Sequence, residues 1–403
     1  MATLFLARYL VPITSPPVED GALLVAEGRI VGGDAILLPP LVNAHTHLEL
    51  SHFPQWTDLY APGPSPAGFV DWIQQVIRVK RQVTPEQFEA SLAAGIESSL
   101  TAGTGAVGDI LSYFPARKVY ANNPLRGHLY LETLGRDPAS SRRILKRIGE
   151  LLDEKRAGQL KLGIAPHSPY SASEEYLEQV FDFARRRKVP TTLHLAESRE
   201  ETAFVYDSLG PLVDRLFPMV GWEKMIPPPS RRSPGAFVEK CGGLVPSCLL
   251  AHGVQVDQAD VERLARSGAA LVCCPRSNAR LGVGQAPVAR YRRSGVPLAL
   301  GTDSLASNDS LSIWDELAFA ADWFDGQLAP AELLAMATVN GARALGVAAD
   351  QGELRAGRGC NFQVLQPASL PTFNELEAFL CSPGRSAEVR CLFLDAWDVL
   401  QKH

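Results

Sequence analysis

Several features that would place a protein at a membrane or on nucleic acid are missing from this sequence. No apolar run approaches the roughly 20 residues that a membrane-spanning helix needs. The first ten residues have neither a basic region nor a small-residue cleavage site. The formal net charge is −5, so no basic surface for nucleic acid or anionic lipid is indicated. We therefore expect a cytoplasmic protein whose partner is a small-molecule substrate, with neither nucleic acid nor membrane as a partner.

Cysteine and glycine motifs with a characteristic spacing are also missing. The seven cysteines are irregularly spaced with no C-x-x-C, which argues for reduced thiols and against a disulfide or zinc-finger framework. No G-x-G-x-x-G follows a predicted strand, and no internal repeat is visible. The composition, 46% hydrophobic and 21% charged over 403 residues, is that of a globular protein with one large domain and a small one.

Near-continuous apolar strands alternate with helices through most of the chain. Such strands are typical of parallel sheets that are buried on both faces, and eight strand–helix units predict an α/β fold of the (β/α)8 TIM-barrel type. A doubly wound sheet is the alternative, but it lacks its glycine motif here. The predicted strands are residues 35–47, 105–110, 127–134, 160–165, 191–196, 247–251, 269–274 and 296–301.

Both chain ends read as β-structure. Strand-like segments are residues 4–11 and 22–31 near one end, and residues 360–365 and 389–394 near the other. We predict a small β-sandwich domain built from residues 1–38 and 348–403, around a barrel of residues 39–347. Two stretches have little regular pattern: residues 51–68, which fit either a lid over the substrate or a surface loop, and residues 210–242, which are predicted to be partly exposed loop.

Chemistry is indicated first by His45 and His47, at the end of the first barrel strand. Residues i and i+2 of a strand share a face, so both imidazoles can reach one cation. A lone His-x-His is weak, because that spacing is common. In a barrel of this type, however, catalytic side chains stand at the C-terminal strand ends, and five of the eight histidines fall there. Packing alone explains five poorly, since each buried imidazole needs a partner.

Three imidazoles and one carboxylate form a ligand set that suits one divalent metal ion, Zn²⁺ first and Fe²⁺ as the alternative. These ligands are His45, His47, His194 and Asp303. Such a metal lowers the pKa of a bound water toward ~7 and so provides a hydroxide nucleophile. Glu197, three residues after His194, is placed to pass protons, although a salt bridge to Arg199 is its structural alternative. His252 could hold the hydroxide or polarise the group under attack.

Taken together, the segments around these residues resemble the amidohydrolase superfamily, in its mononuclear aminohydrolase branch. The matching stretches are residues 40–47, 165–170, 194–197, 250–253, 274–278 and 301–308. The resemblance implies the same four metal ligands, with Glu197, His252 and Asp303 as catalytic residues and His167 in contact with the substrate. A binuclear relative would need a carboxylated lysine, for which Lys161 is the only candidate, at the start of its strand.

The resemblance also narrows the activity that we expect. Triazine dechlorinases of this branch tend to lack a glutamate at the position of Glu197, so its presence favours deamination. The segments around Arg276 and Ser304 look most like deaminases of 6-amino-6-deoxyfutalosine and similar adenine nucleosides. Arg276 suits an anionic substrate group, with a structural salt bridge weighed equally. Trp56, Trp72 and Ser304 complete the predicted substrate contacts.

The expected function is thus metal-dependent hydrolytic deamination of an amino-substituted purine or purine nucleoside, in which metal-bound hydroxide attacks the amino-bearing carbon and ammonia leaves. Three alternatives stay open: triazine-type chlorohydrolase, guanine or pterin deaminase, and a catalytically silent barrel scaffold. The exact substrate is open too. The sequence does not define the oligomeric state, and a homodimer is carried as one option.

Overall fold

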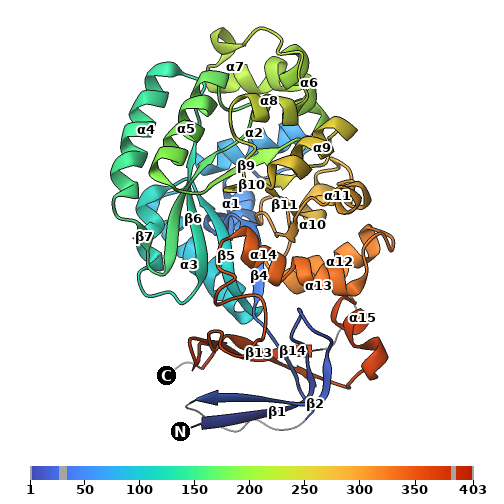
Figure 1. The fold of residues 1–403 in the computed structure, drawn as a ribbon. Coiled ribbons are helices and arrows are strands. Elements are labelled where there is room, and N and C mark those ends of the chain that lie inside the picture. Colours follow the sequence, from blue (N-terminus) through green and yellow to red (C-terminus); the bar gives the residue numbers. More distant parts are fainter. Residues whose placement is uncertain (1, 27–33, 383–386, 402–403) are drawn as a thin grey trace.

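The computed structural model describes residues 2–26, 34–382 and 387–401. It shows a ring of parallel strands surrounded by helices, with a second sheet at one end of the ring that carries both chain termini (Figure 1). The predicted TIM-barrel fold is confirmed. Among the described residues, no helix is both long and apolar enough to cross a membrane.

Eight strands form the barrel, and each pairs in parallel with the next. They are β4 (Leu41–Thr46), β5 (Thr104–Leu111), β6 (Arg126–Thr133), β8 (Leu160–Pro166), β9 (Thr191–Leu195), β10 (Cys248–His252), β11 (Ala270–Cys273) and β12 (Leu298–Leu300). A parallel bridge between Thr46 and Asp303 joins the first strand to the segment after the last and closes the ring. A short strand, β7 (Arg156–Ala157), pairs antiparallel with β8 outside this ring.

Apolar side chains fill the inside of the barrel below its C-terminal rim. They belong to one buried cluster: Val42, Ala44, Ala106, Ile110, Tyr130, Ala165, Leu249, Ala270, Val272, Cys274, Ala299, Ala342 and Leu345. Small residues make room for large ones. A Cβ at Gly163, for example, would lie only 2.6 Å from Cδ1 of Tyr130, so glycine leaves space for that ring. The interior is therefore a packed core and not a channel, as in other barrels of this size.

The first long outer helix of the barrel has a capped N-terminus. Thr84 Oγ1 accepts a hydrogen bond from Gln87 N, and Gln87 Oε1 accepts one from Thr84 N, which forms a capping box before α3 (Pro85–Thr101). Further barrel helices are α4 (Pro138–Leu152), α5 (Glu174–Arg187), α6 (Arg199–Asp207), α9 (Gln258–Ser267), α11 (Val288–Ser294) and α12 (Ile313–Trp323). Shorter elements are η1 (Leu48–Leu50), η2 (Phe114–Tyr120) and α10 (Pro275–Arg280).

The helical pattern of residues 330–345 is split into α13 (Pro330–Met336) and α14 (Val339–Ala344). The break at Thr338 has a packing reason. It leaves the carbonyl of Ala337 free to accept a hydrogen bond from Val42 N, at 2.8 Å, next to the start of the first barrel strand. Satisfying that buried strand N–H therefore outweighs one more turn of helix.

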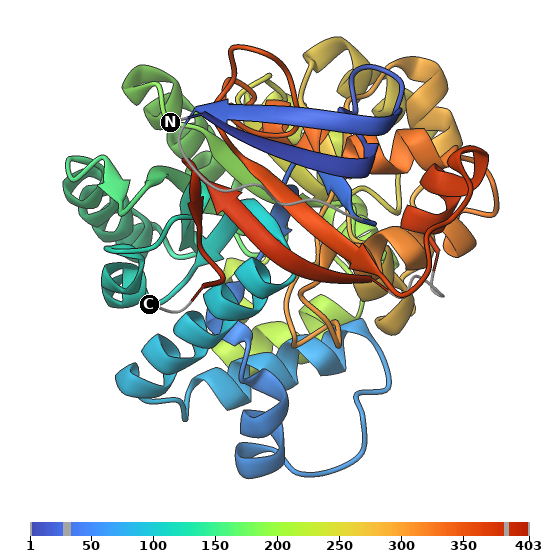
Figure 2. The ribbon, with the colours of Figure 1, turned by 90° about the horizontal axis from the view of Figure 1, so that it is seen from below.

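The second sheet has the order β15-β14-β13-β3-β1-β2 (Figure 2). Its strands are β1 (Ala2–Leu10), β2 (Val18–Ala26), β3 (Ile36–Leu38), β13 (Phe362–Pro367), β14 (Ala387–Leu394) and β15 (Trp397–Asp398). Both chain ends contribute, as predicted; residues 27–31 of the predicted second strand lie outside the described residues. The prediction that the domains meet at residues 38/39 and 347/348 stays a prediction.

The second sheet is strongly curved. β1 and β14 are three strand spacings apart, about 14 Å in a flat sheet, yet the rings of Phe5 and Phe393 lie 5.3 Å apart. Their approach folds the sheet over a buried cluster that includes Phe362 and Val364. Gln363 and Val389 of this sheet lie against Gly103, just before β5 begins. The sheet therefore covers the N-terminal ends of the barrel strands, opposite to their catalytic ends.

Both stretches that were predicted as irregular contain helices. Residues 51–68 contain α1 (Phe53–Tyr60), which is followed by α2 (Phe69–Lys80). The helix α1 is held in place because Phe53 and Trp56 pack into a buried cluster with Val79 and Phe88. Residues 210–242 contain η3 (Leu212–Leu216), α7 (Phe217–Val220), η4 (Glu223–Met225) and α8 (Pro234–Lys240). Near the C-terminus are η5 (Phe373–Glu375) and α15 (Leu376–Leu380). Local pattern missed these helices because tertiary burial stabilises them.

Candidate active site

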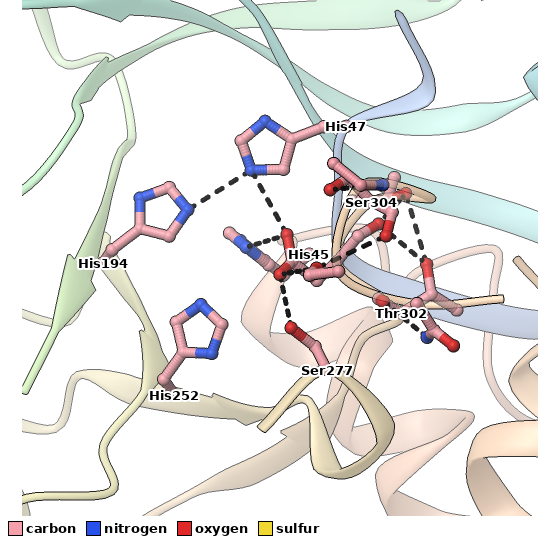
Figure 3. A network of polar contacts seen from close by, with 12 residues as sticks. His45, His47, His194, His252, Ser277, Thr302 and Ser304 are labelled. Atoms are coloured by element: carbon pink, nitrogen blue, oxygen red, sulfur yellow. Dashed lines mark hydrogen bonds and ion pairs between the residues drawn. The ribbon is translucent and has the colours of Figure 1, made fainter. Parts of the chain in front are cut away.

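Four side chains from three strand ends converge at the C-terminal rim of the barrel. His45 lies near the end of β4 and His47 directly follows that strand. His194 belongs to β9, and Asp303 follows β12. One ligand atom of each lies within 4.8 Å of the others. Figure 3 shows the imidazoles of His45, His47 and His194 turned toward one another. The structure thus brings together the four residues that the sequence selected as metal ligands.

Hydrogen bonding leaves the inward nitrogens of this cluster without ordinary partners. His194 Nδ1 donates to the carbonyl of His167 at 2.8 Å, which leaves Nε2 to face His47 Nε2 at 3.2 Å. Neither ring nitrogen of His45 has a hydrogen-bond partner in the described part of the chain, although this side chain is 1% exposed. An unpartnered buried imidazole is costly unless a cation accepts its lone pair. The donor set therefore fits a bound divalent metal.

Protonation of these side chains fits the same conclusion. Burial lowers the pKa of His45, and lowers the pKa values of His47 and His194 further, so all three are neutral near pH 7. For Asp303, burial alone would raise the pKa, but the nearby imidazoles of His45, His252 and His47 hold it well below its usual range. Three neutral imidazoles and one carboxylate are the protonation states that metal binding requires.

A second group lies beside the first. Glu197, His252 and Asp303 each offer a ligand atom within 4.8 Å of the others. Glu197 Oε1 stands 3.7 Å from His252 Nε2, and neither atom has a hydrogen-bond partner among the described residues. Burial and then the charge of Asp303 raise the pKa of Glu197 well above its usual value. Without a bound ion, this environment therefore favours the protonated form of the carboxyl. Among the described residues, Glu197 Oε1 does not form the salt bridge to Arg199 that was its structural alternative.

The strand ends that carry this chemistry adopt unusual backbone geometry. Ala196, His252 and Asp303 have φ angles of 50°, 72° and 57°, in the left-handed region that residues other than glycine seldom occupy. Glu201 stabilises the first of these turns, because its carboxylate accepts from Ala196 N at 2.9 Å and from Glu197 N at 3.0 Å. Such strain is retained where the surrounding structure holds it, and it commonly marks functional sites.

Supporting residues were the part of the site that sequence reasoning missed. Ser277 and Ser307 donate to Asp303, and Asn278 Oδ1 lies 2.9 Å from His252 Nδ1. They lie in the two segments that the sequence singled out, residues 274–278 and 301–308, but no pattern says where these side chains point. For Glu201 a signal existed: Ser198-x-x-Glu201 is a capping-box sequence. Ser198 does cap the helix, but the carboxylate of Glu201 turns instead to the strand end.

His167, predicted to contact the substrate, stands beside the metal cluster. Its ring lies 4.8 Å from that of His194. Nδ1 is 2.9 Å from both Ser168 Oγ and Ser171 Oγ, which leaves Nε2 for a further partner. Burial first, and then the charge of Lys80, lower the pKa of His167 to about 3, so the ring is neutral near pH 7.

The other predicted substrate contacts are engaged with protein groups. Trp72 Nε1 donates to the carbonyl of Ala306 at 2.8 Å and so ties α2 to the turn after Asp303. Trp56 is 4% exposed and packs against Phe88, with ring centroids 5.5 Å apart. Ser304 Oγ accepts from Ala306 N at 3.3 Å. These contacts order the rim; whether the same residues also touch a substrate stays a prediction.

Arg276 matches the salt-bridge reading, one of the two that the sequence left equal. Its Nε donates to Asn308 Oδ1 at 3.0 Å, Nη2 is paired with Asp309, and Nε lies 3.8 Å from the buried Glu316. These contacts use Nε and Nη2 and do not involve Nη1, so whether Arg276 also binds a substrate anion stays a prediction. Lys161, which the binuclear alternative needs, is exposed at the start of β8, away from the cluster at the strand ends.

Comparisons with known proteins agree with this geometry. The Amidohydrolase family matches residues 36–379. The aminodeoxyfutalosine deaminase of Deinococcus radiodurans is 32% identical over 330 residues, 77% of this chain and 74% of that protein. The 5-methylthioadenosine/S-adenosylhomocysteine deaminase of Haloarcula marismortui is 28% identical over 392 residues, 93% of this chain and 83% of that protein.

Among solved structures, the aminofutalosine deaminase of Helicobacter pylori superposes with a TM-score of 0.83 at 22% identity, over 99% of this chain and 100% of that one. At this identity the likeness establishes the fold alone. The family match, in contrast, spans the whole barrel and every strand end described above. Sequence, fold and site thus agree, and the chain belongs to the amidohydrolase family.

Proposed function

We propose that this protein is a metal-dependent hydrolytic deaminase of an adenine nucleoside, with 6-amino-6-deoxyfutalosine as the first candidate substrate. Two curated relatives named as deaminases of such nucleosides support the substrate class. The observation that carries the reaction type is the carboxyl of Glu197. It is 3% exposed, has a raised pKa, and stands free of hydrogen bonds at Oε1, 3.7 Å from His252 Nε2.

His45, His47, His194 and Asp303 would hold one divalent ion, and three nitrogens with one oxygen suit Zn²⁺ or Fe²⁺. We propose zinc as the resident metal. When bound, the ion supplies Lewis-acid chemistry, because it lowers the pKa of a water molecule enough for attack near neutral pH.

Glu197 begins the reaction as an acid. Its proton passes to the purine ring nitrogen beside the amino-bearing carbon, which makes that carbon more electrophilic. His252 acts as the base toward the attacking water. Its Nδ1 donates to Asn278 Oδ1, so the neutral ring presents the Nε2 lone pair toward Glu197.

The proton count then closes. The ring nitrogen keeps the proton that Glu197 gave it. Of the two water protons, one leaves on the amine as ammonia and the other restores Glu197, while the water oxygen becomes the carbonyl of the product. His167, neutral and with Nε2 available, would orient the purine ring of the substrate by a hydrogen bond. A carboxyl that both gives and takes a proton is needed for loss of ammonia, whereas release of chloride needs no protonated leaving group.

Triazine-type chlorohydrolase chemistry and guanine or pterin deamination are the remaining catalytic alternatives, and a silent scaffold is the non-catalytic one. The complete ligand set argues against a scaffold. Cytoplasmic location and a homodimer stay predictions.

The test is ammonia release by the purified protein from 6-amino-6-deoxyfutalosine, 5-methylthioadenosine, guanine and pterin, with chloride release from a chlorotriazine beside it. We expect ammonia release, and the adenine nucleosides should give a higher kcat/KM than guanine or pterin. Glu197→Gln should lower kcat by roughly 10²- to 10⁴-fold while metal content is unchanged. Glu200→Gln, three residues further on in the first turn of α6, is the matched control. Full activity in the Glu197 variant, or chloride release without ammonia, would refute the proposal.

A further inference from the structure

The two oxygens of the Asp303 carboxylate have different surroundings. Oδ2 accepts hydrogen bonds from Ser277 Oγ at 2.7 Å and from Ser307 Oγ at 2.6 Å. Oδ1 points instead toward the imidazoles, 3.8 Å from His45 Nε2 and 3.6 Å from His47 Nε2. One oxygen is thus held by hydroxyl groups, and the other faces the candidate metal position.

The two serines approach Oδ2 from separate elements. Ser277 lies in α10, directly after β11, and Ser307 lies four residues after Asp303 in the turn that follows β12. Both residues are 0% exposed. Ser307 Oγ has a second acceptor, the carbonyl of Ser304, but that atom is more distant at 3.3 Å. Two buried hydroxyls therefore have the same carboxylate oxygen as their nearest acceptor, and hydrogen bonds to a charged acceptor are the stronger kind.

This arrangement bears on how the carboxylate can bind a cation. A free carboxylate can bind a metal through one oxygen or through both. Two hydroxyl hydrogens on Oδ2 occupy its lone pairs and prevent the carboxylate from rotating, so Oδ1 alone stays available on the side of the histidines. Partners of this kind orient a metal ligand and tune its basicity.

We propose that Ser277 and Ser307 are positioning residues that keep Asp303 as a one-oxygen metal ligand and thereby set the affinity for the metal. The inference rests on the metal site of the proposed function. It adds residues from two further segments of the chain to that site, and both hydroxyls contact Oδ2 of Asp303 rather than Oδ1. The competing explanation is that the hydroxyls only fill space and hold the turn after Asp303.

Metal affinity separates the two explanations. The full-length protein, stripped of metal, is titrated with Zn²⁺ against a competing chromophoric chelator. We expect Ser277→Ala and Ser307→Ala each to weaken zinc binding by about 10- to 100-fold. Ser99→Ala, a buried serine whose Oγ donates to Gly95 O in α3, is the matched control and should bind zinc as the wild type does.

A second readout is the visible spectrum of the Co²⁺-loaded protein. If the carboxylate of a serine variant binds through both oxygens, the coordination number rises and the d–d bands weaken; a space-filling role leaves the spectrum unchanged. Comparisons use whichever single variant is folded by circular dichroism at the titration temperature.

Wild-type zinc affinity and an unchanged Co²⁺ spectrum in the serine variants would overturn this inference and leave the deaminase proposal standing. Loss of fold in both single variants, with Ser99→Ala folded, would assign the hydroxyls to structure and overturn it too. A wild-type protein that binds no zinc or cobalt would instead refute the metal site of the proposed function, and this inference with it.

Discussion

The two ends of the barrel each bury a histidine, and the comparison shows what makes one of them a candidate ligand. His194 at the mouth is 6% exposed, and His128 near the opposite end of β6 is 7% exposed. Burial lowers both pKa values, that of His128 to about 4. His128, however, stacks on the ring of Tyr130 at 5.5 Å, whereas His194 has four imidazoles of the site within that distance. Convergence of donors, and not burial, distinguishes the site.

The same division appears along a single strand. In β10, Leu249 points into the apolar barrel core, and three residues later His252 ends the strand beside Glu197. The base of the barrel is covered by the second sheet and contributes packing, while the mouth holds polar groups whose partners are incomplete. Stability and chemistry are thus placed at opposite ends, as is usual for this fold. Substitutions at matched positions can test that separation.

The largest effect is expected from His194→Ala compared with His128→Ala. Removing one of four ligands should abolish stoichiometric metal binding and lower kcat/KM by more than the roughly 10- to 100-fold expected for an outer partner. The His128 variant should keep its metal and its activity, because that side chain has no ligand neighbours. Metal per chain by atomic emission, together with ammonia release, measures both. A His194 variant that retains one metal ion per chain would remove the distinction between the two ends.

Leu249→Ala should show the opposite behaviour. Truncating a leucine in the barrel core should lower the free energy of unfolding by about 2–5 kcal/mol, since lost transfer energy adds to the cost of a cavity. The kcat of the folded protein should change little. Urea unfolding of Leu24→Ala, where the leucine is 69% exposed, gives the matched control and should show almost no change. Equal losses in the two variants would mean that the barrel core does not dominate stability.

Asn278 offers a smaller and two-sided test at the mouth. Its hydrogen bond raises the pKa of His252 against the lowering by burial. Asn278→Leu should therefore move the acid limb of the pH–rate profile, where His252 becomes the neutral base, to lower pH, with a loss of about tenfold in kcat. Asn278→Asp, which adds a negative charge, should move that limb to higher pH. Unshifted limbs in both variants would mean that His252 is not the titrating base.

The most gradual effect concerns how the stability of the metal-free protein depends on pH. The pKa of His167 falls from 6.5 to about 3 on folding. Between these values the unfolded chain binds a proton that the folded protein does not, so stability is lost as the pH falls from 6.5 toward 3. One such proton contributes a slope of at most about 1.4 kcal/mol per pH unit. His167→Gln should flatten urea-derived stability over this window, and an unchanged slope would contradict the assignment.

Much of the site follows from local sequence. Alternation of apolar strands and helices predicts the barrel, and polar residues at strand ends then select His45, His47, His194 and Asp303, because parallel strands of a closed barrel bring those ends together. The helix start at Thr84 is equally local, since its cap depends on a neighbour three residues away. The hydrogen bond from Thr46 to Asp303, in contrast, spans 257 residues and exists only once the ring closes.

What the sequence determined by itself was therefore the order of the strands and the identity of the groups at their ends, because both are written in local spacing. The tertiary structure alone decided where Ser277 and Ser307 point, that Arg276 is bound by Asn308 and Asp309, and that residues 53–60 form a helix. Each of these depends on partners far away in the chain, whose positions no local pattern encodes.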